Sequence, residues 1–135
     1  MAHVCAKNKT GVILMHMRGT PATMQTDVKY NDLMSHIFNH LEERIDFAVK
    51  AGIKKERIAI DPGIGFGKSP EDNLKIINRL SEFKAMGRPI VLGPSRKSFI
   101  GKVLGLDAKD RLEGSIATVA AGIFNGANIV RVHDV

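Results

Sequence analysis

The sequence predicts an α/β fold of four successive β/α units, which corresponds to part of a (β/α)8 barrel. Three observations lead to this prediction. Four short apolar runs alternate with segments that carry apolar residues at helical spacing. The runs are almost wholly apolar, which is typical of parallel strands covered on both faces. Polar and charged residues directly follow several of the runs, so the candidate functional side chains lie at the carboxyl ends of the predicted strands.

The length of the chain indicates that it can form only part of such a barrel. The chain has 135 residues, enough for one domain with a sizeable core. A complete eight-unit barrel takes about 250 residues. We therefore interpret residues 1–135 as one domain. Residues 1–8 resemble the last turns of a helix and Val135 directly follows a strand, so we expect the chain to be a piece of a longer barrel.

The first predicted unit is a strand over residues 11–17 followed by a helix. Apolar residues recur at helical spacing between residues 33 and 49, and Gly52 then supplies a stop. The stripe that this helix should bury consists of Leu33, Ile37, Leu41, Ile45, Ala48 and Val49.

The second unit is a strand over residues 57–60 and a helix that begins after Ser69. Ser69 suits the N-cap, Pro70 the first helical position and Asp72 the third, which together form a capping box. We expect one helix from here to Gly87. Its buried stripe should consist of Leu74, Ile77, Leu80 and Phe83.

The third unit has a strand over residues 89–93, and the fourth begins with a strand over residues 128–132. Between them a helix is expected from about Asp110, with Gly126 after its end. Its inward face should carry Leu112, Ile116, Val119 and Ile123. Alternation of this kind indicates right-handed βαβ units.

Composition and charge narrow the choice of partner. The formal net charge of +6 favours anions. One Tyr, six Phe and no Trp leave little surface for stacking bases, so we expect a small anionic ligand and no nucleic acid.

No apolar stretch reaches the roughly 18 residues of a membrane span, and the N-terminus does not resemble a signal peptide. Because Cys5 is the single cysteine, we expect a cytoplasmic protein without an intrachain disulfide.

Two groups of cations follow strands and suggest an anion site. The third strand leads into Ser95, Arg96, Lys97 and Ser98, where a helix could begin and present free backbone N–H groups. On the last strand Arg131 and His133 are two residues apart and so face the same way, as an oxyanion clamp requires. Solvated cations, and a structural role for His133, are the alternatives.

A glycine-rich segment, residues 61–69, follows the second strand. It is not a P-loop, because Pro62 stands where the first glycine belongs, and not a dinucleotide fingerprint, because Lys68 replaces the last glycine. A tight βα turn is one interpretation. Asp61 favours a ligand site instead, since a carboxylate at a strand end can accept hydrogen bonds from paired N–H donors.

Other residues suggest less specific roles. His36 and His40 have helical i,i+4 spacing, but Ile37 stands where a zinc protease needs Glu, so we expect a solvated helix face. Met15 fits a core position, and Cys5 fits inert packing.

Taken together, the four motifs resemble dihydropteroate synthase, in order and over essentially the whole chain; they are residues 14–21, 61–68, 93–98 and 131–135. The resemblance implies a TIM barrel that joins 6-hydroxymethyl-7,8-dihydropterin diphosphate to p-aminobenzoate and releases diphosphate in folate biosynthesis. Sulfonamides compete with p-aminobenzoate in that family. The partners it implies are these small-molecule substrates. Nothing in the sequence corresponds to the first half of the family's barrel, so the resemblance makes residues 1–135 a pterin-binding domain that forms the C-terminal half of such a barrel.

The resemblance also implies roles for single residues. Asp61 would accept hydrogen bonds from the amino-pyrimidine edge of the pterin, and Lys97 would reach its carbonyl and ring nitrogen. Ser98 would face the carboxylate of p-aminobenzoate, with Arg96 shaping that pocket. The slot for the pterin ring would be lined by Met15, Phe66 and Gly93, and the diphosphate would be held by Arg131 and His133.

The reaction implied by the resemblance needs no protein nucleophile. Loss of diphosphate leaves a cation delocalised into the pterin ring, which the aromatic amine attacks. Arg131, His133 and Mg²⁺ would stabilise the leaving charge, and Asp61 would favour the cationic pterin. In the family the magnesium ligand is an Asn on the first strand of the barrel, and this strand has no counterpart in the sequence. We therefore expect no metal ligand in this chain. We also expect little or no activity of the chain alone.

Two other functions stay open. A pterin-dependent methyltransferase domain shares the barrel and the Asp, although it has no need of the cations at Arg96, Lys97 and Arg131. The other is a non-catalytic half-barrel that associates with itself or a partner. Open strand edges also predict a homodimer or other self-association.

Overall fold

The computed structural model describes residues 1–19 and 29–134; Thr20, Pro21 and Val135 of the motifs lie outside these ranges. The described strands are β1 (Val12–Met15), β2 (Ile58–Asp61), β3 (Val91–Leu92) and β4 (Ile129–Val130). β1 pairs with β2 and β3 with β4, both in parallel, and a parallel bridge between Ile60 and Ile90 joins the two pairs. The spatial order therefore follows the chain, as successive βαβ units predict.

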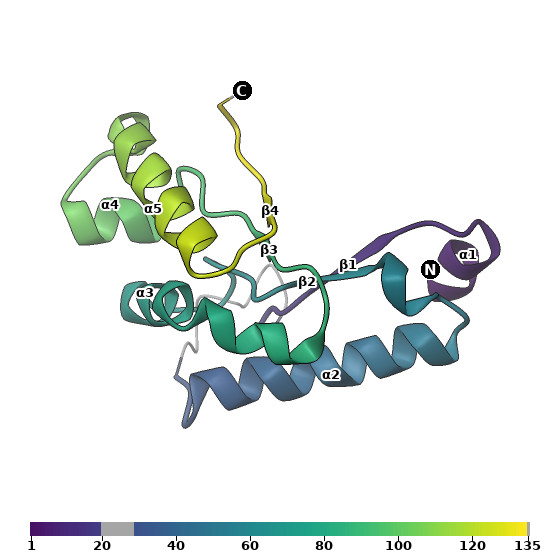
Figure 1. The fold of residues 1–135 in the computed structure, drawn as a ribbon. Coiled ribbons are helices and arrows are strands. Elements are labelled where there is room, and N and C mark those ends of the chain that lie inside the picture. Colours follow the sequence, from purple (N-terminus) through teal and green to yellow (C-terminus); the bar gives the residue numbers. More distant parts are fainter. Residues whose placement is uncertain (20–28, 135) are drawn as a thin grey trace.

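The first connecting helix, α2 (Leu33–Lys50), lies below the strands in the view of Figure 1. Its buried residues confirm the stripe expected from its sequence. Asp32 caps it by accepting a hydrogen bond from the Ser35 N–H. Leu33, Ile37, Leu41 and Ala48 are buried, while Ile45 and Val49 are half-buried. The short η1 (Lys55–Arg57) then leads into β2.

The second connection differs from the single helix that we predicted. α3 (Pro70–Asn78) begins with the expected capping box of Ser69 and Asp72, but it ends before the 3-10 segment η2 (Leu80–Met86). Leu74 is 46% exposed, so its predicted burial is wrong. Ile77, Leu80 and Phe83 are buried as predicted, and Asn73 and Ile76 occupy the buried face in place of Leu74. Asn73 belongs there because its amide bonds the Gly65 N–H and the Ser69 carbonyl.

The third connection consists of α4 (Ser98–Leu104), η3 (Ala108–Asp110) and α5 (Leu112–Phe124). The predicted inward face of α5 is wrong, because Leu112, Ile116 and Ile123 are exposed and Val119 is half-buried. Its buried face consists of Gly114, Ser115 and Gly122. A Cβ at Gly122 would lie 2.2 Å from Leu92 Cδ2, so small residues allow α5 to approach the strands closely.

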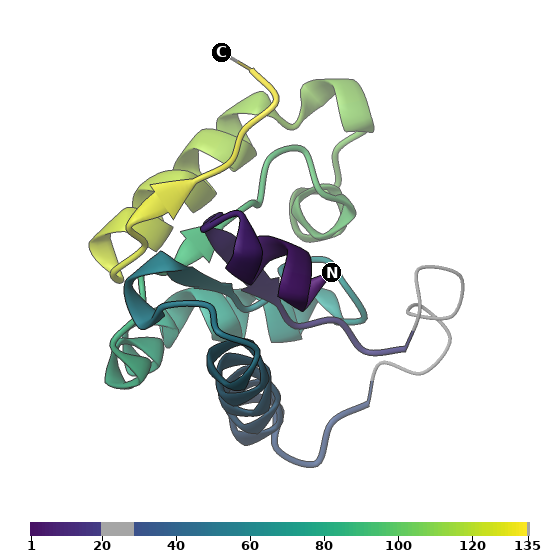
Figure 2. The ribbon, with the colours of Figure 1, turned by 90° about the vertical axis from the view of Figure 1, so that its right-hand side faces the viewer.

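The main core lies between the strands and the helices α2, α3 and η2; it includes Ile37, Leu41, Ile60, Ile76, Phe83, Ile90 and Leu92. α1 (Ala2–Lys7) lies near the amino ends of β1 and β2 (Figure 2), where Cys5 and Ala6 pack with Ile58. Among the described residues no helix is long and apolar enough to cross a membrane.

Candidate functional site

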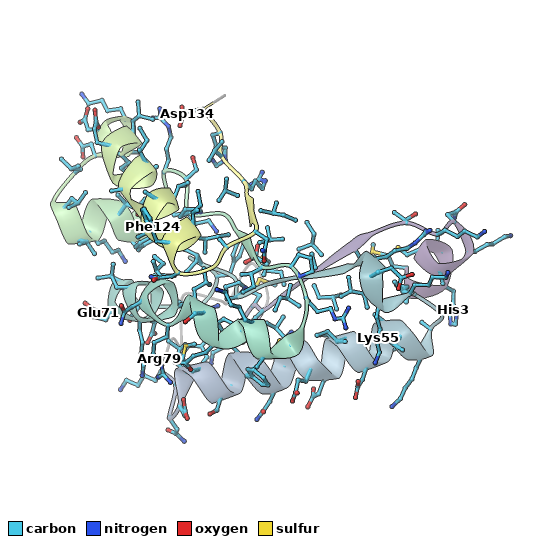
Figure 3. All side chains as sticks on the ribbon, in the orientation of Figure 1. His3, Lys55, Glu71, Arg79, Phe124 and Asp134 are labelled. Carbon is cyan, nitrogen blue, oxygen red and sulfur yellow. The ribbon has the colours of Figure 1, made fainter. Side chains whose placement is uncertain are left out.

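The predicted site residues lie at the carboxyl ends of the strands, away from the amino ends near His3 and Lys55 (Figure 3). Met15 and Asp61 are register partners, so they point to the same face of the sheet. Gly93 and Arg131 follow the register pair Leu92 and Val130 and adjoin each other, since a Cβ on Gly93 would lie 3.8 Å from Arg131 Cβ. The structure therefore brings these four residues to one rim.

Asp61 is a half-buried carboxylate with spare hydrogen-bonding capacity. Its Oδ1 accepts the Gly63 N–H at 2.7 Å, and among the described residues no donor reaches Oδ2. Burial raises the pKa of Asp61, and this effect is opposed by the Gly63 hydrogen bond and by the positive charges of Lys97, Lys68 and Arg131. These cations favour the ionised form, which accepts hydrogen bonds from a ligand.

Lys97 lies between the second and third strand ends. Its Nζ donates to the Ile64 carbonyl and stands 4.2 Å from the centre of the Phe66 ring, a cation–π contact. Burial lowers the pKa of Lys97 to about 8, although Asp61 opposes the shift. Gly65 permits this arrangement, because its φ is +79° and a Cβ there would lie 2.8 Å from Lys97 Cδ.

Arg131 and His133 extend beyond β4 with exposed side chains. Their backbones are fixed, since the Arg131 N–H donates to the Leu92 carbonyl at 2.9 Å and the His133 N–H donates to Ser95 Oγ at 3.2 Å. The structure thus places Arg131 close enough to act electrostatically on Asp61 and Lys97. No hydrogen bond of the His133 ring to another described residue is found.

Arg96 has a partner that the sequence analysis missed. Its guanidinium forms a bidentate pair with Asp134, at 2.7 Å from Nη2 to Oδ1 and 2.9 Å from Nε to Oδ2. Arg96 also has a φ of +54°, and its N–H donates to Ser115 Oγ at 2.8 Å. Ser98 is exposed as the first residue of α4, while Ser95 is buried outside that helix. Arg96 and Ser98 therefore lie at the rim beyond β3, apart from Asp61.

A second missed feature lies beneath the rim. His16 is fully buried, and Lys68 is 4% exposed with its Nζ 2.9 Å from His16 Nδ1. His36 is exposed and His40 half-buried, and both rings contact His16 edge to face, at 5.3 Å and 5.0 Å between centroids. Lys68 inside the glycine-rich segment is the one sign of this pair in the sequence, but its partner His16 lies 52 residues away in the chain.

Comparison with known proteins identifies the family of the chain. The fold and the site define a barrel-type α/β protein whose charged residues gather at the strand ends. Residues 1–133 match the family model described as pterin binding enzyme, and the chain belongs to this family. Dihydropteroate synthase from Synechocystis is 47% identical over 133 residues, which are 98% of this chain and 46% of that protein.

Solved structures of dihydropteroate synthases are also similar to this chain. Dihydropteroate synthase from Yersinia pestis, in complex with a sulfonamide drug, superposes with a TM-score of 0.96 at 39% identity, over 98% of this chain and 48% of that one. The enzyme from Clostridium difficile, in the presence of pteroic acid, gives a TM-score of 0.90 at 46% identity, over 99% and 49% of the two chains. The chain therefore spans about half the length of the relatives it matches.

Proposed function

We propose that the chain supplies the pterin- and diphosphate-binding half of a dihydropteroate synthase, in which the pterin diphosphate and p-aminobenzoate condense to dihydropteroate. One observation carries the proposal. The half-buried carboxylate of Asp61 faces the cations Lys97 and Arg131 at one rim. A carboxylate beside two cations matches a ligand that combines an N–H-rich ring with a polyphosphate.

In this proposal each group has a defined task. Asp61 binds the amino-pyrimidine edge and stabilises the ring as positive charge develops on it, because a fixed negative charge favours the cationic state. Lys97 binds the ring carbonyl and keeps Phe66 against the pterin. Arg131 and His133 bind the diphosphate and stabilise the charge that forms as it leaves.

The remaining contacts complete the two substrate sites. Met15 and Gly93 line the pterin slot, while Arg96 and Ser98 shape the p-aminobenzoate pocket. The similarity to a structure with pteroic acid supports this division, since that molecule joins a pterin to p-aminobenzoate.

Further parts of the proposal rest on the family resemblance. They are a partial barrel of four units, a cytoplasmic location and the use of Mg²⁺. The described residues hold no group of three His, Cys, Asp or Glu side chains that could bind a metal ion. Self-association is proposed because α5 exposes Ile116 by 60% and Phe124 by 89%.

A chimaera tests the function directly. Residues 1–133 would replace the aligned segment of the Synechocystis relative, and dihydropteroate formation would be measured. We expect activity in the chimaera and a loss of at least about 100-fold in kcat/KM with Lys97→Ala, because a charged group at the reacting substrate is removed. Asp61→Asn should weaken pterin binding measured by calorimetry.

The matched control is Asp46→Asn, which removes an exposed carboxylate from α2. It should leave both readouts unchanged. An inactive but folded chimaera, or full activity in Lys97→Ala, contradicts the proposed function.

A further inference from the structure

A pair of buried polar side chains, His16 and Lys68, connects the end of β1 to the turn after β2. Lys68 Nζ lies 2.9 Å from His16 Nδ1 and donates to the Phe66 carbonyl at 3.0 Å. His16 follows β1, whereas Phe66 and Lys68 belong to the turn formed by residues 61–68. One amine therefore joins two segments that are 52 residues apart.

The path of this turn depends on His16 at two further points. The His16 N–H donates to the Asp61 carbonyl at 3.0 Å. A Cβ at Gly63 would lie 1.8 Å from the His16 carbonyl oxygen, so the two backbones are in direct contact. Lys68 closes the far end of the turn on the His16 ring. The turn that carries Asp61 and Phe66 is thus anchored on His16 at both ends.

Charged and titratable groups face Lys68 from several elements. Asp61 at the end of β2 and Asp72 in α3 favour its ammonium form, while Lys97 after β3 opposes it. Burial is the largest effect and lowers the pKa of Lys68 to about 7. The groups that face His16 and, together with its burial, lower its pKa to about 3 are Lys68, His40, His36 and Arg18.

We propose that Lys68 is a positioning residue of the ligand site: by binding His16 and the Phe66 carbonyl, its amine fixes the turn that presents Asp61 and Phe66 to a pterin. This role rests on the proposed function only in that the ligand is taken to be a pterin. Lys68 acts through these residues, since its side chain lies beneath the rim. The ring of Phe66 contacts Lys97, so a displaced turn would also move the cation that faces Asp61.

The protonation state of Lys68 should control this anchor. Hydrogen bonds from an ammonium are about twice as strong as those from a neutral donor. Neutral His16 can accept such a bond at Nδ1. Loss of the proton weakens both bonds and removes a positive charge that favours the ionised form of Asp61. The hydrogen bonds of the anchor should therefore weaken as the pH rises through about 7, although full exposure of Lys68 becomes less favourable, because a solvated Lys68 would keep its proton.

Amide NMR of the 135-residue chain tests the anchor without any ligand. The signals of Gly63, Gly65 and Phe66 should shift between pH 5.5 and 9 with a midpoint near 7. In Lys68→Met the component with a midpoint near 7 should vanish, and only that of Lys97, near 8, should remain. In the control Lys75→Met, which changes an exposed lysine of α3, the component near 7 should persist. Should Lys68→Met fail to fold, the wild-type titration still decides, because a profile without a midpoint near 7 at these three amides overturns the proposal.

A binding measurement separates this inference from the proposed function. In the chimaera described above, Lys68→Met should weaken binding of 6-hydroxymethyl-7,8-dihydropterin diphosphate about tenfold, the effect of losing one hydrogen bond to a charged group. Unchanged affinity in Lys68→Met, with a loss in Asp61→Asn, overturns the positioning role alone. Unchanged affinity in Asp61→Asn, with the NMR transition present, contradicts the pterin site and leaves the anchor standing.

Discussion

Replacing Lys68 by Met should remove a rise in stability with pH that the wild-type chain shows above neutral pH. Burial lowers the pKa of Lys68 from 10.5 to about 7 in the folded chain. Between these values the unfolded chain keeps the proton and the folded chain has lost it. Because the unfolded state then binds more protons, the free energy of unfolding rises with pH across this window.

The size of this rise follows from the two pKa values. The lowering from 10.5 to about 7 corresponds to about 5 kcal/mol over the whole window. Little of this is lost to solvent screening, since Lys68 is 4% exposed. From pH 7.5 to 9.5 the expected contribution is about 2.5 kcal/mol. Lys97, whose pKa is lowered to about 8, adds a rise of the same sign to both chains, so the difference between them isolates Lys68.

Urea unfolding followed by circular dichroism at pH 7.5, 8.5 and 9.5 measures the effect. Lys68→Met also loses two hydrogen bonds, which are weaker once Lys68 is neutral. The folded-state pKa of about 7 already includes this difference, so the expected wild-type slope keeps its sign. The control Lys75→Met should show the wild-type slope, because Lys75 is exposed. Equal slopes in the wild type and Lys68→Met would refute the reasoning.

Two further predictions concern the turn and the rim. Gly63→Ala should destabilise the chain by about 3 kcal/mol or more in the same unfolding assay, because its φ is +75° and the added Cβ would overlap the His16 carbonyl; Gly87→Ala, at φ +60° with no atom within 4 Å, should cost only about 1 kcal/mol. Similar costs would rule out the close contact. Replacing Arg131 or His133 by Ala in the chimaera should weaken calorimetric binding of the pterin diphosphate more than that of the bare pterin, and non-additively. Equal losses for the two ligands would indicate general unfolding instead.

The sequence predicts those parts of the fold that local pattern controls. The stripe of α2 and the capping box at Ser69 follow from spacing within a few residues, and both are confirmed. Asp61, Lys97 and Arg131 were predicted to share a rim, because parallel strands end at one edge and each residue follows a strand. The structure confirms their proximity, while their roles stay predictions.

The errors come from packing between distant elements. In α5 the large apolar residues suggested the buried face, but Gly114 and Gly122 allow closer approach to Ile100 and Leu92. A hydrophobicity pattern gives glycine little weight, so it cannot indicate such a contact. The pairing of Arg96 with Asp134 and of Lys68 with His16 also depends on strand register, which places residues 38 and 52 positions apart in contact.

The charges at the rim explain why a buried lysine suits this site. Asp61 must stay ionised in a partly desolvated place, where burial alone would protonate it. Lys97 and Arg131 provide positive charge, but in the proposed function both also bind the ligand. Lys68 favours the Asp61 carboxylate from beneath and leaves the rim free for a substrate. Its burial costs stability, and the hydrogen bonds to His16 and Phe66 offset part of that cost while they fix the turn.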